Sequence, residues 1–259
     1  MLAQERRNLI LERLQEEKSV VVGELSQRYS VSEETIRRDL DKLEKDGFAT
    51  KSYGGAVINE NVNIDMPFNV RKKRNISGKQ KIAGMVEGMV ESGDHIILDA
   101  STTAVFIAKA IKHKKNLTVI TNSIEIMIEL SDVPGWKIIS PGGSLREGYL
   151  ALIGPRVSEG LRAYHVEKAF VSCKGVEMES GFTDGNEDVA QTKRTMLHCA
   201  KEKILVVDSS KFDTVAFAHI GDLEDVDAVV TDRTPSQSWI DFFAENNIRC
   251  YFPDAADCK

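Results

Sequence analysis

The chain of 259 residues is long enough for one large domain, or for a small domain joined to a medium one. Apolar residues make up 42% of it, which is enough for a hydrophobic core and excludes a chain that is disordered throughout. The net charge of −6 excludes a uniformly basic surface, so any binding of nucleic acid must come from a local patch.

The cysteines and the start of the chain narrow the class further. None of the cysteines forms a C-x-x-C pair, so neither a zinc cluster nor a secreted disulfide framework is indicated. They are Cys173, Cys199, Cys250 and Cys258. The N-terminal stretch MLAQERRN is charged rather than a signal peptide, and no apolar run approaches the ~18 residues of a membrane helix. We therefore expect a cytoplasmic protein that contacts no membrane and needs no metal or cofactor.

The first 58 residues carry the pattern of a small helical domain followed by a hairpin. Residues 4–17 predict a helix whose apolar side holds Leu9, Ile10 and Leu14. A β-branched run, a second helix, a turn, a third helix and a hairpin around two glycines follow at 20–22, 23–29, 30–32, 33–46 and 48–58. This order is typical of a winged helix-turn-helix.

The third predicted helix lies in VSEETIRRDLDKLEKDG, residues 31–47. Ile36, Leu40 and Leu43 recur at the spacing of one buried helical stripe, and Gly47 is suited to end the helix. The first half leaves hydroxyl and guanidinium groups off this stripe, and such groups bind DNA phosphates and base edges. They belong to Ser32, which is also a good N-cap, and to Thr35, Arg37 and Arg38.

An ordinary solvated helix face is the alternative explanation of these charges. Glu34 and Arg38 stand at i,i+4 and can form an ion pair worth about 0.3–0.5 kcal/mol. Residues 1–58 hold ten Lys/Arg against eleven Asp/Glu, so the segment is nearly neutral. DNA binding is favoured because the helix acids lie mostly further along, away from a groove that the N-terminal half would enter. These acids are Asp39, Asp41, Glu44 and Asp46.

The same stretch, followed by YGGA, resembles the DNA-binding signature of the DeoR family of bacterial sugar-metabolism regulators. The matching residues are Val31, Ser32, Thr35, Ile36, Arg37, Arg38, Asp39, Leu40, Leu43, Gly54, Gly55 and Ala56. The resemblance implies a transcriptional regulator that binds a double-stranded operator. We expect the DNA contacts to come from Ser32, Thr35, Arg37, Arg38, Lys51 and Tyr53.

A linker is expected at 59–75, because residues 59–70 are polar, contain a proline and lack helical periodicity. Residues 71–81, RKKRNISGKQK, then carry six basic residues and no acid. They could contact DNA backbone, a ligand phosphate or an acidic neighbour, or form a solvated run that leads into a helix at 78–91. Arg74 and Lys81 fall where the DeoR family often has basic residues.

Strands and helices alternate in the remaining part, 76–259. The strand candidates are 95–100, 117–121, 136–140, 168–173, 203–208, 227–232 and 248–252. Several are continuous β-branched runs, as expected for buried parallel strands. Helices are predicted at 102–112, 123–131, 188–201 and 236–246. The class is α/β, in which ligands bind at the carboxyl ends of the strands.

Five of these strands end in small, polar or cationic residues. The ends hold Asp99, Ser101, Thr102 and Thr103; Thr121, Asn122 and Ser123; Gly142 and Gly143; Lys174 and Gly175; and Ser209, Ser210 and Lys211. Hydroxyls at a helix N-terminus such as that after Asp99 can bind phosphate, but for this strand end taken alone plain N-capping is the favoured explanation. Taken together, the five ends favour a polyhydroxylated anion as ligand, with Asp99 facing sugar hydroxyls and lysine facing negative charge.

The DeoR resemblance extends over this half. The matching segments are Asp99-x-x-Thr102-Thr103, Thr121-Asn122-Ser123, Gly142-Gly143, Gly154, Gly175, Gly181, Lys193-Arg194-x-Met196 and 208–212. The resemblance implies a sensor domain similar to the ribose-5-phosphate isomerase fold, a phosphorylated sugar or polyol as effector, and a role for Lys193 in effector binding. The resemblance also implies that the effector relieves repression, while the residues themselves do not state the sign. We expect a homodimer or homotetramer, because two winged helices related by symmetry fit the two half-sites of an operator.

Two positions depart from the family pattern, which usually has Gly at Ser101 and an acid at Lys174. Lys174 could read an extra negative charge on the effector, or it could face solvent or pair with Glu177 or Asp184. An isomerase with a fused helix-turn-helix is the main rival function. Lysine is a poor replacement for the carboxylate base that isomerisation needs, so we expect no catalytic residues. A cysteine-based metal or redox sensor is a further alternative, with Cys173 as a thiol activated by Lys174 or as a small buried residue.

Overall fold

A computed structural model describes residues 1–59 and 66–253 of the chain. These form two compact units, residues 1–74 and 75–259, and each is described by itself below. Residues 60–65 of the predicted linker, and Cys258, lie outside the described residues.

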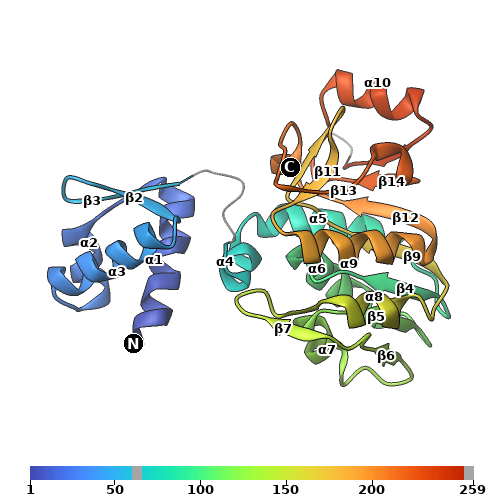
Figure 1. Ribbon diagram of the computed structural model, residues 1–259, viewed down its shortest axis with the longest axis horizontal. Helices are drawn as coiled ribbons and strands as arrows, with labels where there is room; N and C mark the ends of the chain where they lie inside the picture. Colours follow the sequence, from blue (N-terminus) through green and yellow to red (C-terminus); the bar gives the residue numbers. More distant parts are fainter. Residues whose placement is uncertain (60–65, 254–259) are drawn as a thin grey trace. The chain divides into compact units, whose positions relative to one another are not determined.

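The first unit has the predicted winged helix-turn-helix order (Figure 1). Its helices are α1 (Ala3–Glu17), α2 (Val22–Tyr29), α3 (Glu33–Lys45) and α4 (Phe68–Lys73). Its strands, β1 (Ser19–Val21), β2 (Ala49–Ser52) and β3 (Gly55–Ile58), form an antiparallel sheet in the order β1-β3-β2. The side chain of a residue at Gly55 would collide with the Val20 carbonyl, so glycine allows β1 and β3 to approach.

The core of this unit is built around the stripe predicted on α3. Ile36, Leu40 and Leu43 are at most 3% exposed and pack in one cluster with side chains of α1, α2 and the sheet. On α1 the buried stripe consists of Ile10, Leu11 and Leu14, and Leu9, which we had predicted to be buried, is only partly covered. The apolar spacing on α3 therefore fixes which side chains of that helix face water.

Helix α4 is a difference from the prediction, because it lies in the stretch expected to be an irregular linker. Val70 is 2% exposed and belongs to the core of the first unit, and Lys73 Nζ bonds Glu12 of α1 at 2.9 Å. Six residues are too few to show helical periodicity in the sequence, and packing on α1 stabilises the helix instead.

The second unit is built on a parallel sheet of seven strands in the order β15-β14-β12-β9-β4-β5-β6. The strands are β4 (His95–Leu98), β5 (Thr118–Thr121), β6 (Lys137–Ile139), β9 (Val166–Val171), β12 (Ala200–Val206), β14 (Ala228–Val230) and β15 (Arg249–Tyr251). Each of the seven predicted strand segments overlaps one of them. The α/β class is thus confirmed.

The helices of this unit cover both faces of the sheet (Figure 1). They are α5 (Ile76–Glu87), α6 (Thr102–Ala110), α7 (Ile124–Leu130), α8 (Pro155–Leu161), α9 (Glu187–His198) and α10 (Gln237–Glu245), with short 3-10 turns η1 (Ile111–His113), η2 (Ser209–Lys211) and η3 (Leu223–Asp225). Some predicted helix bounds were wrong. The helix expected at 78–91 begins at Ile76, where Asn75 caps it, and the helix expected at 188–201 ends at His198 because β12 begins at Ala200.

Two small antiparallel sheets and α8 were not predicted. One sheet joins β10 (Gly175–Glu177), β11 (Gly181–Asp184) and β13 (Ala218–Gly221), and the other pairs β7 (Ser144–Arg146) with β8 (Ala151–Ile153). These strands have three or four residues each, too few for an alternating pattern to be recognised.

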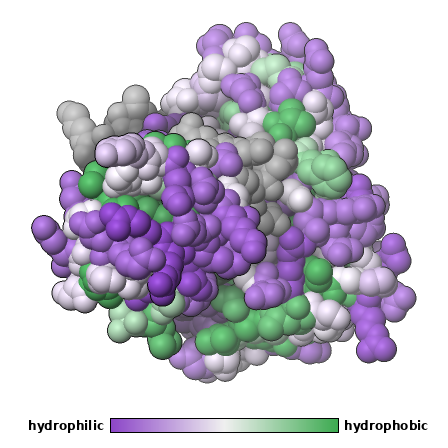
Figure 2. Space-filling model, turned by 60° about the vertical axis from the view of Figure 1, so that its left-hand side comes forward, coloured by the Kyte–Doolittle hydropathy of each residue, from purple (hydrophilic) through white to green (hydrophobic). Residues whose placement is uncertain are grey.

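The core and the surface of the second unit follow from the sheet. Alternate strand residues such as Ile97, Val171 and Leu205 pack in one cluster with apolar side chains of α8, α9 and α10. The face of the protein drawn in Figure 2 is mostly hydrophilic, with separate hydrophobic patches. Among the described residues, no helix combines the length and the apolar character that crossing a membrane requires.

Candidate DNA-binding surface and effector site

The turn between α2 and α3 presents the start of α3 to solvent. Ser30 takes a left-handed conformation with φ of 52°, and Ser32 caps α3 by accepting a hydrogen bond from the Thr35 N–H at 3.2 Å. The hydroxyls of Ser32 and Thr35 also lie 2.9 Å apart. Both predicted hydroxyl residues therefore stand together at the helix N-terminus, where free N–H groups favour a DNA phosphate.

Arg37 and Arg38 project from the exposed side of α3. Their side chains are 53% and 77% exposed, and they form i,i+4 ion pairs with Glu33 (2.6 Å) and Glu34 (3.3 Å). Exposed pairs of this kind contribute roughly 0.2–1 kcal/mol. Both guanidinium groups can therefore exchange a glutamate for a DNA group at little cost.

Asp39 is buried, unlike the other acids of the predicted helix. It is 3% exposed, and its Oδ2 accepts a hydrogen bond from Arg6 Nε of α1 at 2.5 Å. Arg7 Nη1 lies 3.6 Å from its other oxygen. Asp39 is thus a buried attachment of α3 to α1.

The two residues predicted on the hairpin differ in their surroundings. Tyr53 stands at the tip between β2 and β3 and is fully exposed. Lys51 Nζ forms an ion pair with Asp41 of α3, and the Lys51 N–H donates to Glu44 at 2.8 Å. Lys51 therefore joins the hairpin to α3, and contact with DNA would need an exchange of partner.

The five strand ends predicted to hold the ligand belong to five consecutive strands, β12, β9, β4, β5 and β6. From β4 the chain continues to β5 and β6 on one side, and later returns to β9 and β12 on the other. The sheet therefore reverses its order between β4 and β9. In open α/β sheets the crevice at such a reversal is where ligands bind.

Asp99 stands at this reversal, immediately after β4, but it is fully buried. Its Oδ1 accepts the Ser101 N–H and its Oδ2 accepts the Ser172 N–H, both at 3.0 Å. The carboxylate thus fastens the end of β9 to the end of β4. Both oxygens are bonded within the protein, and the contact of Asp99 with sugar hydroxyls stays a prediction.

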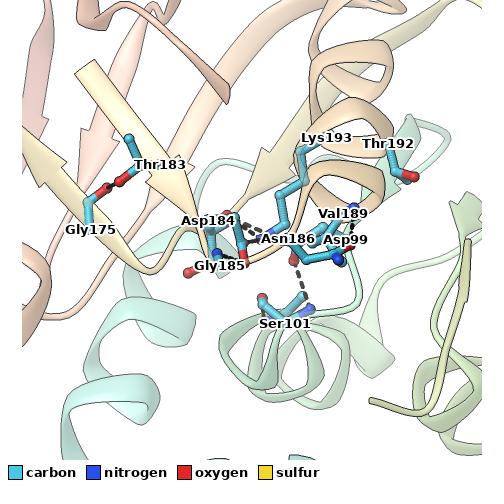
Figure 3. Close-up of polar contacts among 12 residues, drawn as sticks. Asp99, Ser101, Gly175, Thr183, Asp184, Gly185, Asn186, Val189, Thr192 and Lys193 are labelled. Atoms are coloured by element: carbon cyan, nitrogen blue, oxygen red, sulfur yellow. Dashed lines mark hydrogen bonds and ion pairs between the residues drawn. The ribbon is translucent and has the colours of Figure 1, made fainter. Parts of the chain in front are cut away.

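Lys193 of α9 completes the same buried group (Figure 3). Its Nζ lies 2.6 Å from Asp184 Oδ2, 2.8 Å from the Ser172 carbonyl and 3.5 Å from Asp99 Oδ2. Burial alone would raise the pKa of Asp184, but the Lys193 ammonium outweighs it and holds that pKa below its ordinary value. Lys193 therefore balances two buried carboxylates, and its role in effector binding stays a prediction.

Lys174 and Gly175 follow β9 on the opposite side of this group. The Lys174 N–H donates to the Thr183 carbonyl at 2.9 Å, and the charge of Lys174 helps to lower the pKa of Asp184. A side chain at Gly175 would collide with the Thr214 carbonyl, so glycine is required there by packing. Burial raises the pKa of the neighbouring Cys173 thiol to about 12, which favours the alternative of a small buried residue over that of a reactive thiol.

The hydroxyls at the ends of β4 and β5 act chiefly as caps. Ser101 Oγ accepts the Ala104 N–H at 3.0 Å, and Ser123 Oγ accepts the Ile126 N–H at 3.3 Å. Thr121 Oγ1 accepts the Ser123 N–H at 3.1 Å, and Asn122 Nδ2 donates to the Leu152 carbonyl at 2.8 Å. Thr102 and Thr103 form the first turn of α6 and are at most 6% exposed.

The five strand ends form a row in the order β12, β9, β4, β5 and β6. The glycines after β6 and the lysine after β12 lie at the two ends of this row. Gly142 and Gly143 are exposed and have φ of 82° and 111°, a region that favours glycine. Lys211 belongs to η2 and is half-buried. Burial would raise the pKa of Asp208, but Lys211 and hydrogen bonds from Ser210 hold that pKa below its ordinary value.

Comparisons with known proteins agree with this architecture. A family model described as the DeoR-like helix-turn-helix domain matches residues 6–62, and one described as the DeoR C terminal sensor domain matches residues 74–233. The chain belongs to the DeoR family.

Curated DeoR-type relatives match along almost the whole chain. The uncharacterized HTH-type transcriptional regulator YulB of Bacillus subtilis (strain 168) is 44% identical over 232 residues, 90% of each chain. The HTH-type transcriptional repressor GlcR of the same organism is 34% identical, over 96% of this chain and 95% of its own. The glycerol-3-phosphate regulon repressor of Escherichia coli (strain K12) is 28% identical, over 95% and 97%.

Among solved structures, ribose 5-phosphate isomerase A of Methanocaldococcus jannaschii matches 52% of this chain and 53% of its own, with 18% identity and a TM-score of 0.38. A TM-score of this size carries no argument about activity. The DeoR relatives are named as transcriptional regulators, and this chain is a DNA-binding transcriptional regulator rather than an enzyme.

Several residues of this DeoR-type site were missed by the sequence analysis. Asp184 was considered only as a partner of Lys174, and Ser172, Lys79 and Asp232 were not considered. Lys79 is 4% exposed, although it lies in the basic run for which a solvated surface was one of the alternatives. A signal was available for Asp232, since it follows β14 as Asp99 follows β4. For Ser172 and Lys79 the local sequence holds no such signal.

Proposed function

We propose that this DeoR-family chain is a repressor of a carbohydrate-metabolism operon whose operator binding is controlled by a phosphorylated sugar or polyol. The observation that carries the sensing part is the row of five consecutive strand ends at the reversal of the sheet order. Half-buried Lys174 and Lys211 lie at two of these ends. The names of relatives, which include a repressor of a glycerol-3-phosphate regulon, support the same class of effector.

In this proposal the predicted effector residues divide into two groups. The lysines, the first turn of α6 and the exposed glycines contact the effector. These are Lys174, Lys211, Thr102, Thr103, Gly142 and Gly143. The remaining residues hold the strand ends in place behind them: Asp99, Ser101, Thr121, Asn122, Ser123, Gly175 and Lys193. Cationic groups and helix N–H donors suit a phosphate, and hydroxyl and backbone groups suit a polyol.

For DNA, we propose that α3 enters the major groove with its N-terminal half, so that Arg37, Arg38, Thr35 and Ser32 reach bases and phosphates. Tyr53 at the hairpin tip and Lys51 behind it face the adjacent backbone. A homodimer or homotetramer places two such units on the half-sites of one operator. An effector that binds the two arrangements of the oligomer with different affinity then shifts operator binding.

Thermal unfolding of the full chain tests the effector class. A specific ligand at about 100 times its dissociation constant adds roughly 2.7 kcal/mol, which corresponds to a rise in melting temperature of about 5–10 °C. We expect a member of a panel of sugar and polyol phosphates to give this rise, and the matching unphosphorylated sugars to give none. Equal shifts with both sets would contradict a phosphate site.

The variant Lys174→Ala decides whether this lysine reads an additional anionic group. If it does, affinity for a bisphosphate or phosphosugar acid falls more than affinity for the corresponding monophosphate. Lys201→Ala is the matched control, because Lys201 is exposed at the far end of β12. Unchanged affinity for every phosphate ester in the panel would leave Lys174 only its part in lowering the pKa of Asp184.

A further inference from the structure

The first residue of the second unit, Asn75, has an unusual conformation and two side-chain hydrogen bonds. Its φ is 46°, in the left-handed region, and it directly follows Arg74, the last residue of the DNA-binding unit. Its Oδ1 caps α5 by accepting the Gly78 N–H at 3.2 Å. Its Nδ2 donates to Asp232 Oδ2, also at 3.2 Å.

Asp232 connects this point to the predicted effector loop. It lies just after β14 and is 2% exposed, and its Oδ1 accepts the Ser209 N–H at 2.6 Å. Ser209 begins η2, the turn that carries Lys211. One carboxylate thus holds the effector loop with one oxygen and Asn75 with the other, while Arg233 Nε lies 3.9 Å away.

The packing around this carboxylate is tight. A side chain at Gly78 would collide with both the Asn75 amide and the Asp232 carboxylate, so the first turn of α5 rests directly on the pair. A movement of Asp232 therefore has to displace either Asn75 or the α5 N-terminus. Buried groups without free space around them respond to a displacement together rather than one by one.

We propose that Asp232 is a positioning residue that links the effector loop to the chain segment leading to the DNA-binding unit. When a phosphate ester engages Lys211 and the N–H groups of η2, Ser209 moves relative to Asp232. The change reaches Asn75, whose conformation sets the direction in which the chain enters the second unit. This inference rests on the proposed effector site, whereas the link itself is a property of the ligand-free chain.

Two single substitutions break the link by different chemistry, and together they restore it. Asn75→Asp keeps the cap on Gly78 but sets two carboxylates against each other. Asp232→Asn keeps an acceptor for Ser209 but turns a second amide N–H group toward that of Asn75. In the double variant the amide at 232 donates to the carboxylate at 75, so this bond is re-formed with reversed polarity, and the amide oxygen at 232 still accepts from the Ser209 N–H.

Amide hydrogen exchange of the full chain tests the link without any ligand. In Asn75→Asp we expect exchange at Ser209–Lys211 to accelerate about tenfold or more, although the substitution lies more than a hundred residues away in sequence. Asp232→Asn should accelerate exchange both at 75–79 and at 209–211. The double variant should return the exchange rates of both segments toward those of wild type. Asn247→Asp is the matched control, because Asn247 has φ of 55° and an exposed side chain.

The outcomes separate this inference from the proposed function. If Asn75→Asp accelerates exchange only at 75–79, or if the double variant is no better than the single ones, the link is absent. With ribose 5-phosphate and glycerol 3-phosphate as probes, wild type should show slowed exchange at 209–211 and altered exchange at 75–79. In Asn75→Asp the probes should slow exchange at 209–211 but leave exchange at 75–79 unchanged. Probes that leave 209–211 unchanged in wild type count against the effector site, while the ligand-free comparison still decides the link.

Discussion

The DNA-binding unit and the sensor unit use charge in opposite ways. On α3, Arg37 and Arg38 are exposed and each pairs with a glutamate one turn earlier, so neither pair contributes much to stability. In the sensor unit, Lys193 is buried between Asp184 and Asp99, where an uncompensated charge is costly. Charges of the first kind can change partners when DNA arrives, and charges of the second kind keep a fixed framework.

The variant Lys193→Ala gives the largest expected effect and tests the buried half of this comparison. It leaves two carboxylates buried without their cation, so the free energy of unfolding should fall by about 3–5 kcal/mol. Urea unfolding of the full chain measures this, with Lys201→Ala as an exposed control expected to stay within about 0.5 kcal/mol. A loss as small as that of the control would mean that the two carboxylates find other partners.

The DNA-binding unit contains one exception to its exposed charges, the buried pair of Arg6 and Asp39. Asp39→Ala should lower the free energy of unfolding of that unit by about 2 kcal/mol, because the Arg6 guanidinium loses its charged acceptor. Operator affinity should also fall, since α3 loses its attachment to α1. Asp46→Ala is a control just after the same helix, where the exposed carboxylate pairs with Lys42. Lowered stability with unchanged operator affinity would show that Asp39 does not orient α3.

Substitution of the exposed arginines should affect binding without affecting stability. Arg37→Ala or Arg38→Ala should weaken operator binding by about 1–3 kcal/mol where the side chain reads a base, and the unfolding free energy should change by less than about 0.5 kcal/mol. A fluorescence titration with operator and scrambled duplexes distinguishes base reading from phosphate contact. Undiminished operator binding in both variants would remove α3 as the recognition helix.

The smallest expected effect is the contribution of the buried carboxylates to the pH dependence of the free energy of unfolding. The folded-state pKa values of Asp184 and Asp208 lie below the ordinary 3.8, so their contribution to stability is present above pH 3.8 and is lost as pH falls below it. Between pH 5 and pH 3 the stability of Asp208→Asn should therefore fall less steeply than that of wild type. Parallel curves from urea unfolding at each pH would contradict the lowered pKa of Asp208.

The sequence predicted elements best where they are long and uniformly patterned. The strands of the parallel sheet are buried on both faces and read as continuous β-branched runs, and the stripe of Ile36, Leu40 and Leu43 identified the inner side of α3. Helix α4 and the strands β7, β8, β10, β11 and β13 escaped, because segments of three to six residues show no periodicity and depend on packing partners.

The candidate effector site also has features that the sequence predicted and features that it did not. Because the strands are parallel, we could predict that their polar ends would lie at one edge of the sheet. The roles of Asp99 and Lys193 did not follow, because they depend on Ser172 and Asp184, which the fold brings from other segments. The burial of Asp39 was not predicted either, because it depends on the position of Arg6 on α1. Pairings between remote residues are decided by tertiary structure, which local sequence does not encode.

The packing of α4 bears on how the DNA-reading part could be obtained alone. Val70 fills part of the core that α1 and α3 share, and Lys73 reaches back to Glu12. A peptide that stops after the hairpin would expose the apolar surface that Val70 covers and should self-associate, which light scattering would reveal. A peptide that runs to Arg74 includes α4, which covers this surface, and should stay monodisperse.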